Sequence, residues 1–275
     1  MTDKFERFAP WLARWELAPD GEPFETGYSR SLLMPVRRGA QPAMLKLAAD
    51  ADERRGAAQM TWWAGDGAAP VLAHQDEALL MVRLEGPLSL AQMARDGRDG
   101  EASRILCAVA DRLHAPRPGG PPGGLVPLER WFRALAPAAA AHGGVLAASL
   151  ETARALFAEP REPCVLHGDL HHANVLDGGA LGWRAIDPKG LFGERGYDYA
   201  NILCNPDEPT AVAPGRLVTQ AAVIAEAARL PLDRVLAWTH AHTGASAAWC
   251  IRDGFDPGPA LAIAEIAQME LAAVS

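Results

Sequence analysis

Residues 165–190 read VLHGDLHHANVLDGGALGWRAIDPKG, and the pattern of this stretch decides the fold. An apolar run up to His167 predicts a short strand, and Gly168 turns the chain after it. The turn sequence Asp-Gly-Gly at 177–179 then separates two further apolar runs, which predicts a β-hairpin. Such a hairpin brings its two ends, Asn174 and Asp187, together although they are thirteen positions apart.

Three polar residues of this stretch fit the chemistry of phosphoryl transfer. Transfer from ATP needs a carboxylate beside the acceptor hydroxyl and oxygen ligands that hold Mg²⁺ against the phosphates. Asp169 is the predicted catalytic carboxylate, and Asn174, five positions on, repeats the Asp-to-Asn spacing of the protein-kinase catalytic loop. Asn174 and Asp187 are the predicted metal ligands, because Mg²⁺ is commonly held by only one or two protein oxygens beside water and phosphate.

Two other kinds of metal site compete for the same segment. His167, His171 and His172 could bind zinc, but no cysteine or further histidine follows at the spacing of a zinc site. Residues 168–171 also resemble part of a dinuclear metallophosphatase signature. That class needs an upstream Asp-x-His and a downstream Gly-Asn-His, and the sequence has neither. The sequence therefore favours the magnesium site.

The same segment carries a family resemblance. The sequence HGDLHHANVL at 167–176, followed by IDPKG at 186–190, resembles the aminoglycoside phosphotransferase family. The sequences GERGYDYAN at 193–201 and GASAAW at 244–249 are most similar to its streptomycin and hydroxyurea kinase branch. The resemblance implies a bilobal, protein-kinase-like α+β fold. A small β-rich lobe would span residues 1–85, a larger and mainly helical lobe residues 86–275, and ATP with Mg²⁺ would bind between them.

The first lobe offers a lysine for the phosphates. Lys46 lies in the apolar run at 43–47, where a charged side chain is costly unless it has a partner. This position fits the lysine that grips the phosphates in kinases, although an edge strand with Lys46 in water is equally compatible. Glu53, in the first turn of a helix that begins near Asp50, is the candidate partner, and Asp50 or Asp52 could replace it.

Further nucleotide contacts follow from the resemblance. It implies that the backbone around Ser29, in a turn between two strands, faces the phosphates. The backbone of Arg83 and Leu84, just before a Gly-Pro hinge at 86–87, is the predicted adenine contact; an ordinary strand end is the alternative.

Two residues are predicted to support the catalytic loop rather than react. Asp198 reads as the N-cap of a helix over 198–203, and the resemblance implies that it ties this helix to the catalytic loop. His167 is assigned the same supporting role. Lys189 could reach phosphate or substrate, and the pattern favours a solvated loop lysine.

The substrate is expected to be a small hydroxylated, cationic molecule, bound by carboxylates and aromatic faces. The candidates are Glu194, Asp253 and Trp249. The net charge of −8 is compatible with a cationic substrate and argues against nucleic acid. The scattered cysteines fit a reducing cytoplasm, and no apolar run reaches the roughly 18 residues of a membrane span.

The leading hypothesis is ATP-dependent O-phosphorylation of a streptomycin-type aminoglycoside, an antibiotic-resistance activity. One alternative keeps the reaction and changes the acceptor to hydroxyurea or another metabolite. The other alternative is a catalytically inactive, nucleotide-binding regulatory module.

Overall fold

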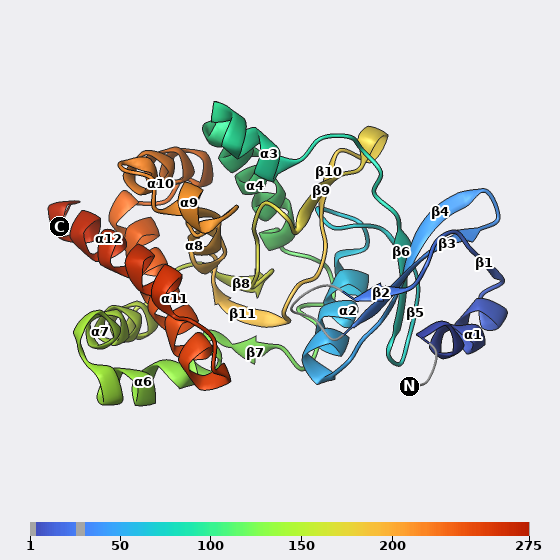
Figure 1. Ribbon diagram of the computed structural model, residues 1–275, viewed down its shortest axis with the longest axis horizontal. Coiled ribbons are helices and arrows are strands. Elements are labelled where there is room, and N and C mark those ends of the chain that lie inside the picture. Colours follow the sequence, from blue (N-terminus) through green and yellow to red (C-terminus); the bar gives the residue numbers. More distant parts are fainter. Residues whose placement is uncertain (1–3, 26–30, 275) are drawn as a thin grey trace.

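The computed structural model describes residues 4–25 and 31–274. An antiparallel six-stranded sheet occupies one end of the molecule, in the order β1-β3-β4-β6-β5 with β2 paired to β3 (Figure 1). Its strands are β1 (Leu17–Pro19), β2 (Phe24–Glu25), β3 (Leu32–Arg38), β4 (Gln41–Leu47), β5 (Val71–Gln75) and β6 (Ala78–Val82).

Two helices cover opposite faces of this sheet. Helix α1 (Lys4–Arg14) buries Phe8 and Trp11 against alternate residues of β3, β4 and β6, and α2 (Ala51–Trp63) packs against the other face through Met60 and Trp63. Successive side chains of a strand point to opposite faces. Since Leu45 and Leu47 face α1, Lys46 faces α2 and the rest of the molecule.

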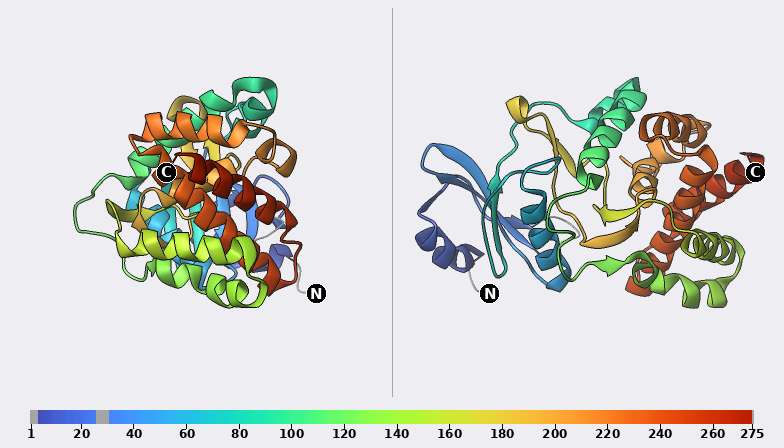
Figure 2. Two further views of the ribbon diagram at one scale, coloured as in Figure 1. Left: turned by 90° about the vertical axis from the view of Figure 1, so that its left-hand side faces the viewer. Right: turned by 180° about the vertical axis from the view of Figure 1, so that it is seen from behind.

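The remainder of the chain is mainly helical. Several of the long helices pack beside one another at the far end of the molecule from the sheet, and α2 lies between the two parts (Figure 1 and the right-hand view of Figure 2). The helices are α3 (Leu90–Met93), a π-helical turn (Ala94–Arg98), α4 (Asp99–His114), α5 (Leu128–Trp131), a 3-10 turn (Phe132–Ala134), α6 (Leu135–His142), α7 (Gly144–Ala158), α8 (Tyr197–Leu203), α9 (Glu208–Ala211), α10 (Arg216–Ala228), α11 (Leu232–Asp253) and α12 (Gly258–Val274).

The catalytic segment, residues 165–190, lies on short strands between the sheet and the helical part. The predicted hairpin is confirmed as β9 (Val175–Asp177) and β10 (Trp183–Ala185), joined through a 3-10 turn (Gly179–Leu181). In this hairpin Val175 lies opposite Ala185, and Asp177 lies opposite Trp183. The predicted strand before Gly168 is β8 (Pro163–Leu166), which joins β11 (Leu191–Glu194) and β7 (Val126–Pro127) in a three-stranded sheet. The loop from Gly67 to Ala69 bonds to Ala185, so the hairpin connects the two parts.

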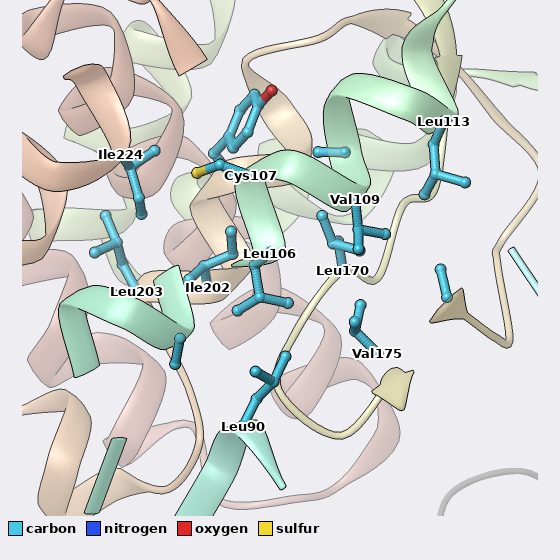
Figure 3. Close-up of a cluster of buried hydrophobic side chains, with 14 of the residues drawn as sticks. Leu90, Leu106, Cys107, Val109, Leu113, Leu170, Val175, Ile202, Leu203 and Ile224 are labelled. Atoms are coloured by element: carbon cyan, nitrogen blue, oxygen red, sulfur yellow. The ribbon is translucent and has the colours of Figure 1, made fainter. Parts of the chain in front are cut away.

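The catalytic loop is anchored by the core. Leu170 and Val175, on either side of the loop, are fully buried among Leu106, Val109 and Ile202 of the helical part (Figure 3). Burying a side chain of this size stabilises a fold by about 1.5–3 kcal/mol. The burial of these two side chains therefore fixes the position of the loop against the helical part.

The predicted α+β, kinase-like fold class is confirmed. The N-cap role predicted for Asp198 is wrong, because α8 begins at Tyr197 and Gly196 is its N-cap residue. The 3-10 turn at 132–134 separates α5 from α6, and α10 begins only at Arg216. Pro214 lacks an N–H and Gly215 has a φ of +75°, which together separate α9 from α10. Among residues 4–25 and 31–274, we find no helix with the length and apolarity that a membrane crossing requires.

Candidate active site

A cleft of about 870 Å³ lies between the sheet and the helical part. Lys46, Glu53 and Met81 line it from the sheet side, whereas Asp169 and Asp187 line it from the catalytic segment. Most of the residues singled out in the sequence therefore share one cavity, although 141 positions separate Lys46 from Asp187. The cavity continues past Asp169 to the C-terminal end of α11, where Trp249 and Asp253 lie.

The carboxylate of Asp169 is held by two amides. The amide of Asn201, on α8, donates to Oδ1 at 2.9 Å, and the amide of Asn174 donates to Oδ2 at 3.2 Å and to the Asp169 carbonyl at 2.8 Å. About a third of the Asp169 side chain is exposed to the cleft. An oriented and accessible carboxylate can accept a proton from a bound hydroxyl.

The ends of the hairpin meet as the turn sequence predicts. The backbone N–H of Ile186 donates to the carbonyl of Asn174 at 2.9 Å, which brings Asn174 and Asp187 to the same edge of the cleft. Because the Asn174 amide nitrogen is engaged by Asp169, its carbonyl oxygen is left as an acceptor. Within the described part of the chain no group of three or more His, Cys, Asp or Glu is arranged for a metal. A pair of oxygen ligands still fits Mg²⁺, which takes its other ligands from water and phosphate.

Lys46 lies between two carboxylates. Its ammonium contacts both Glu53 and Asp187, so the structure brings together the lysine and the acid that the sequence offered for it. Asp50 instead caps α2, accepting from the N–H groups of Asp52 and Glu53. Burial alone would raise the pKa of Asp187, but the ammonium groups of Lys46 and Lys189 hold this pKa well below its usual range. Asp187 is therefore ionised and ready to bind a cation.

Lys189 is not the solvated loop lysine that the sequence pattern favoured. Its ammonium lies 3.1 Å from Asp187 Oδ2, 3.4 Å from Asp169 Oδ2 and 3.9 Å from Glu53 Oε1. Only 22% of the side chain is exposed. Burial opposes its charge, yet the carboxylates of Asp169, Asp187 and Glu53 raise the pKa of Lys189, so the ammonium persists.

Asp198 and His167 hold the backbone of the catalytic loop. The buried Asp198 carboxylate accepts hydrogen bonds from the backbone N–H groups of His167 and Gly168 at 2.7 Å each, and it bonds to Nε2 of the His114 ring at 2.7 Å. His167, also buried, contacts the carbonyl of Ile186 at 2.8 Å and accepts the N–H of Asp169 at 3.2 Å. Burial lowers the pKa of His167, so the ring is neutral and serves as both donor and acceptor.

Of the three predicted substrate residues, two face the cleft and one does not. Trp249 lines the cavity and packs edge-to-face against Trp131 at 5.4 Å, and Asp253 lines it beside Arg252, with which it forms an ion pair. Glu194 does not line the cavity; its side chain is buried and engaged by Arg234, Trp238 and the N–H of Arg161. A carboxylate with these partners is part of the protein interior.

The predicted nucleotide contacts are only partly described. Ser29 lies outside the described residues. The N–H of Arg83 donates to the carbonyl of Pro42 at 3.3 Å, and its guanidinium pairs with Asp20 and Glu85. The adenine contact through the backbone of Arg83 and Leu84 stays a prediction. Among the residues described around the cleft, neither Arg83 nor Leu84 lines it; the apolar side chains of Leu33, Met81 and Ile186 do.

Sequence reasoning missed two residues that shape the site. Asn201 orients Asp169, as described above. Gln59, fully buried on α2, donates to the carbonyl of Leu166 at 2.6 Å and accepts the N–H of Gly190 at 2.9 Å. It thereby joins the helix of Glu53 to both the catalytic loop and the Asp187 loop. A glutamine at an interior position of α2 was the available signal, because buried amides need partners.

Comparison with known proteins places this geometry in a family. The family of aminoglycoside/hydroxyurea antibiotic resistance kinases matches residues 14–254. The chain belongs to this family. Among its relatives is streptomycin 3''-kinase of Klebsiella pneumoniae, which is 51% identical over 248 residues and is matched over 92% of its length and 88% of this chain. Streptomycin 6-kinase of Streptomyces griseus is 32% identical, covering 94% of this chain and 85% of that enzyme. Hydroxyurea phosphotransferase of Kitasatospora aureofaciens is 30% identical, covering 90% of this chain and 73% of that enzyme.

Solved structures agree with the kinase family at the level of the fold. The aminoglycoside phosphotransferase APH(4)-Ia superposes with a TM-score of 0.65 at 16% identity, covering 100% of this chain and 98% of that one. A choline/ethanolamine kinase family protein from Mesorhizobium loti has the same TM-score at 14% identity, covering 98% and 92%. The protein is thus a kinase-family enzyme with a protein-kinase-like fold, and the inactive-module alternative loses its support.

Proposed function

We propose that this kinase transfers the γ-phosphoryl group of ATP to a hydroxyl of streptomycin, at the 3'' position named for the relative that is 51% identical over 88% of the chain. The observation that carries the proposal is the position of Asp169. Its carboxylate lies in one cavity with the Asn174–Asp187 pair and with the Trp249 wall. A phosphoryl donor and a hydroxylated acceptor can therefore meet at this residue.

Each residue has a proposed task. Asp169 orients the acceptor hydroxyl and takes its proton as the oxygen attacks phosphorus. Lys46, fixed by Glu53, binds the α- and β-phosphates, and the apolar side chains of Leu33, Met81 and Ile186 enclose the base of the nucleotide. Asn174 and Asp187 would hold Mg²⁺, which neutralises charge on the β- and γ-phosphates when bound. The sheet with α1 and α2 forms the proposed nucleotide lobe to about residue 85.

The acceptor is proposed to bind at the far end of the cleft. Trp131 and Trp249 supply aromatic surface, and Asp253 supplies a carboxylate for a cationic group. Asp253 is paired with Arg252 in the absence of substrate, and the pair is about half exposed, so exchanging this partner costs little. Streptomycin, which carries guanidinium groups and several hydroxyls, suits such a surface.

The test is incubation of the protein with streptomycin, ATP and Mg²⁺, followed by mass spectrometry and by NMR of the product. We expect the mass of one added phosphoryl group, with the new phosphorus coupling at the 3'' position. Asp169→Asn should abolish the gain. Asp111→Asn, at an exposed aspartate paired with the exposed Arg229, is the matched control and should leave it intact. A wild-type protein that phosphorylates hydroxyurea but never streptomycin would overturn the proposed acceptor and keep the kinase chemistry.

A further inference from the structure

Lysine is rare in this chain. Only three of its 26 basic Lys and Arg residues are lysines, at positions 4, 46 and 189. Two of the three lie in the cleft. Lys46 has the phosphate-binding task proposed above, which leaves Lys189 as the lysine of the cleft without an assigned task.

The backbone of Lys189 is tightly held. Its N–H donates to the carbonyl of His167 at 2.8 Å, and a Cβ on the neighbouring Gly168 would come within 3.1 Å of the Lys189 Cβ. The side chain itself lines the cleft. There it meets three carboxylates, those of Asp187, Asp169 and Glu53.

The two lysines divide these carboxylates between them. Lys46 contacts Oδ1 of Asp187, and Lys189 contacts Oδ2 of Asp187 and then reaches Oδ2 of Asp169. Lys46 therefore lies on the nucleotide side of Asp187, and Lys189 lies between the proposed metal ligand and the proposed base. A phosphoryl group transferred toward Asp169 would therefore come close to this ammonium.

We propose that Lys189 is a further catalytic residue that contacts the phosphoryl group during its transfer. The inference rests on the proposed function. As the bond from the leaving oxygen of ADP to phosphorus breaks and the bond from the acceptor oxygen forms, the hydroxyl proton goes to Asp169. Charge spreads over the three equatorial oxygens of the phosphoryl group. Lys189 donates a hydrogen bond to one of these oxygens and neither gains nor loses a proton.

The choice of lysine fits this task. An ammonium is a compact charge with three donors that can rotate, whereas a guanidinium is a wide, flat group suited to binding one carboxylate in a fixed geometry. A cation within 3.4 Å of two different carboxylates, and able to turn toward a third ligand, is better supplied by lysine. Because most basic residues of this chain are arginines, a lysine at position 189 is an uncommon choice.

The test compares Lys189→Met with Lys4→Met, which removes the lysine of an exposed pair with Glu25 at 3.1 Å. Removing one preorganised donor to developing charge costs about 100- to 1,000-fold in kcat. We expect that loss in Lys189→Met, with the Kd for AMP-PNP and Mg²⁺, measured by calorimetry, changed less than tenfold. Lys4→Met should match the wild type in both measurements.

A chemical rescue separates contact from general charge. In Lys189→Ala, ethylammonium should restore at least tenfold in kcat, and tetramethylammonium at the same ionic strength should not, because it has no N–H to donate. Three results would overturn the inference: a kcat of Lys189→Met within threefold of the wild type, a loss of binding as large as the loss of kcat, or equal rescue by both ions. Failure of the proposed function looks different, since the wild type itself would then leave streptomycin unmodified.

Discussion

Glu194→Ala tests whether this carboxylate belongs to the protein interior or to the substrate. Glu194, at the end of β11, accepts the Arg234 guanidinium at 2.8 and 2.5 Å, the Trp238 indole N–H at 2.8 Å and the Arg161 N–H at 2.9 Å. Its side chain is 2% exposed. Three of these contacts join β11 to α11 and the fourth joins it to the chain before β8; α8 with Asp198 and Asn201 follows shortly after β11.

The size of the effect follows from burial. Alanine leaves Arg234, itself 8% exposed, as an uncompensated charge, and breaking a buried pair in this way costs about 3–5 kcal/mol. Glu194→Gln keeps the shape, but it loses the charge and replaces one acceptor oxygen by an NH₂ group that faces hydrogen-bond donors. If each of the two guanidinium bonds weakens by about 1 kcal/mol, the glutamine variant should lose ~2 kcal/mol.

The difference in stability between the wild type and the glutamine variant should also depend on pH. Burial would raise the pKa of Glu194, but Arg234 and Trp238 hold it below its ordinary value of 4.5. A carboxyl group with a lowered pKa contributes its full stability above its unfolded pKa and loses it as the pH falls through the folded pKa. The stability gap between wild type and Glu194→Gln should therefore be constant above about pH 5 and narrow below pH 4.5.

The assay is urea unfolding of wild type and both variants between pH 3.5 and 7, together with streptomycin kinetics at a temperature where all three are folded. We expect the two losses of stability given above and a KM for streptomycin within threefold of the wild type. A variant with unchanged stability and a KM raised tenfold or more would refute the reasoning and return Glu194 to the substrate site.

Two further predictions concern the support of the catalytic loop. A Cβ at Gly56 would collide with the carbonyl of Pro188, so Gly56→Ala should displace α2 from the Asp187 loop and lower kcat by about tenfold or more. Gly123→Ala, at an open position, is the control. Equal kinetics of the two variants would contradict the prediction. The asparagine of Asp198→Asn cannot accept three hydrogen bonds as the carboxylate does. We therefore expect the free energy of unfolding, measured in urea, to fall by about 2–4 kcal/mol and kcat to fall as well. Unchanged stability would show that the three contacts are not the support we infer.

The catalytic segment could be predicted because its geometry is local. The Asp-Gly-Gly turn and two short apolar runs suffice to close the hairpin, and closing it places Asn174 next to Asp187 whatever the rest of the chain does. For Lys46 the sequence left two possibilities, a partner in the cleft or an edge strand in water, and the contacts with Glu53 and Asp187 decided between them. The fold class followed from these residues and from the family resemblance that they carry.

The tertiary structure alone decided the roles of Glu194, Lys189 and Gln59. Nothing within a few residues of Glu194 shows that Arg234, forty positions later, will bury it, and nothing near Lys189 shows that it will turn toward Asp169. The function of a polar side chain depends on whether it is buried and on which distant group it meets. The sequence by itself determined the chemistry that local turns and strands bring together. Long-range packing of α2, α8 and α11 determined which of the remaining charged and amide groups support that chemistry and which hold the interior.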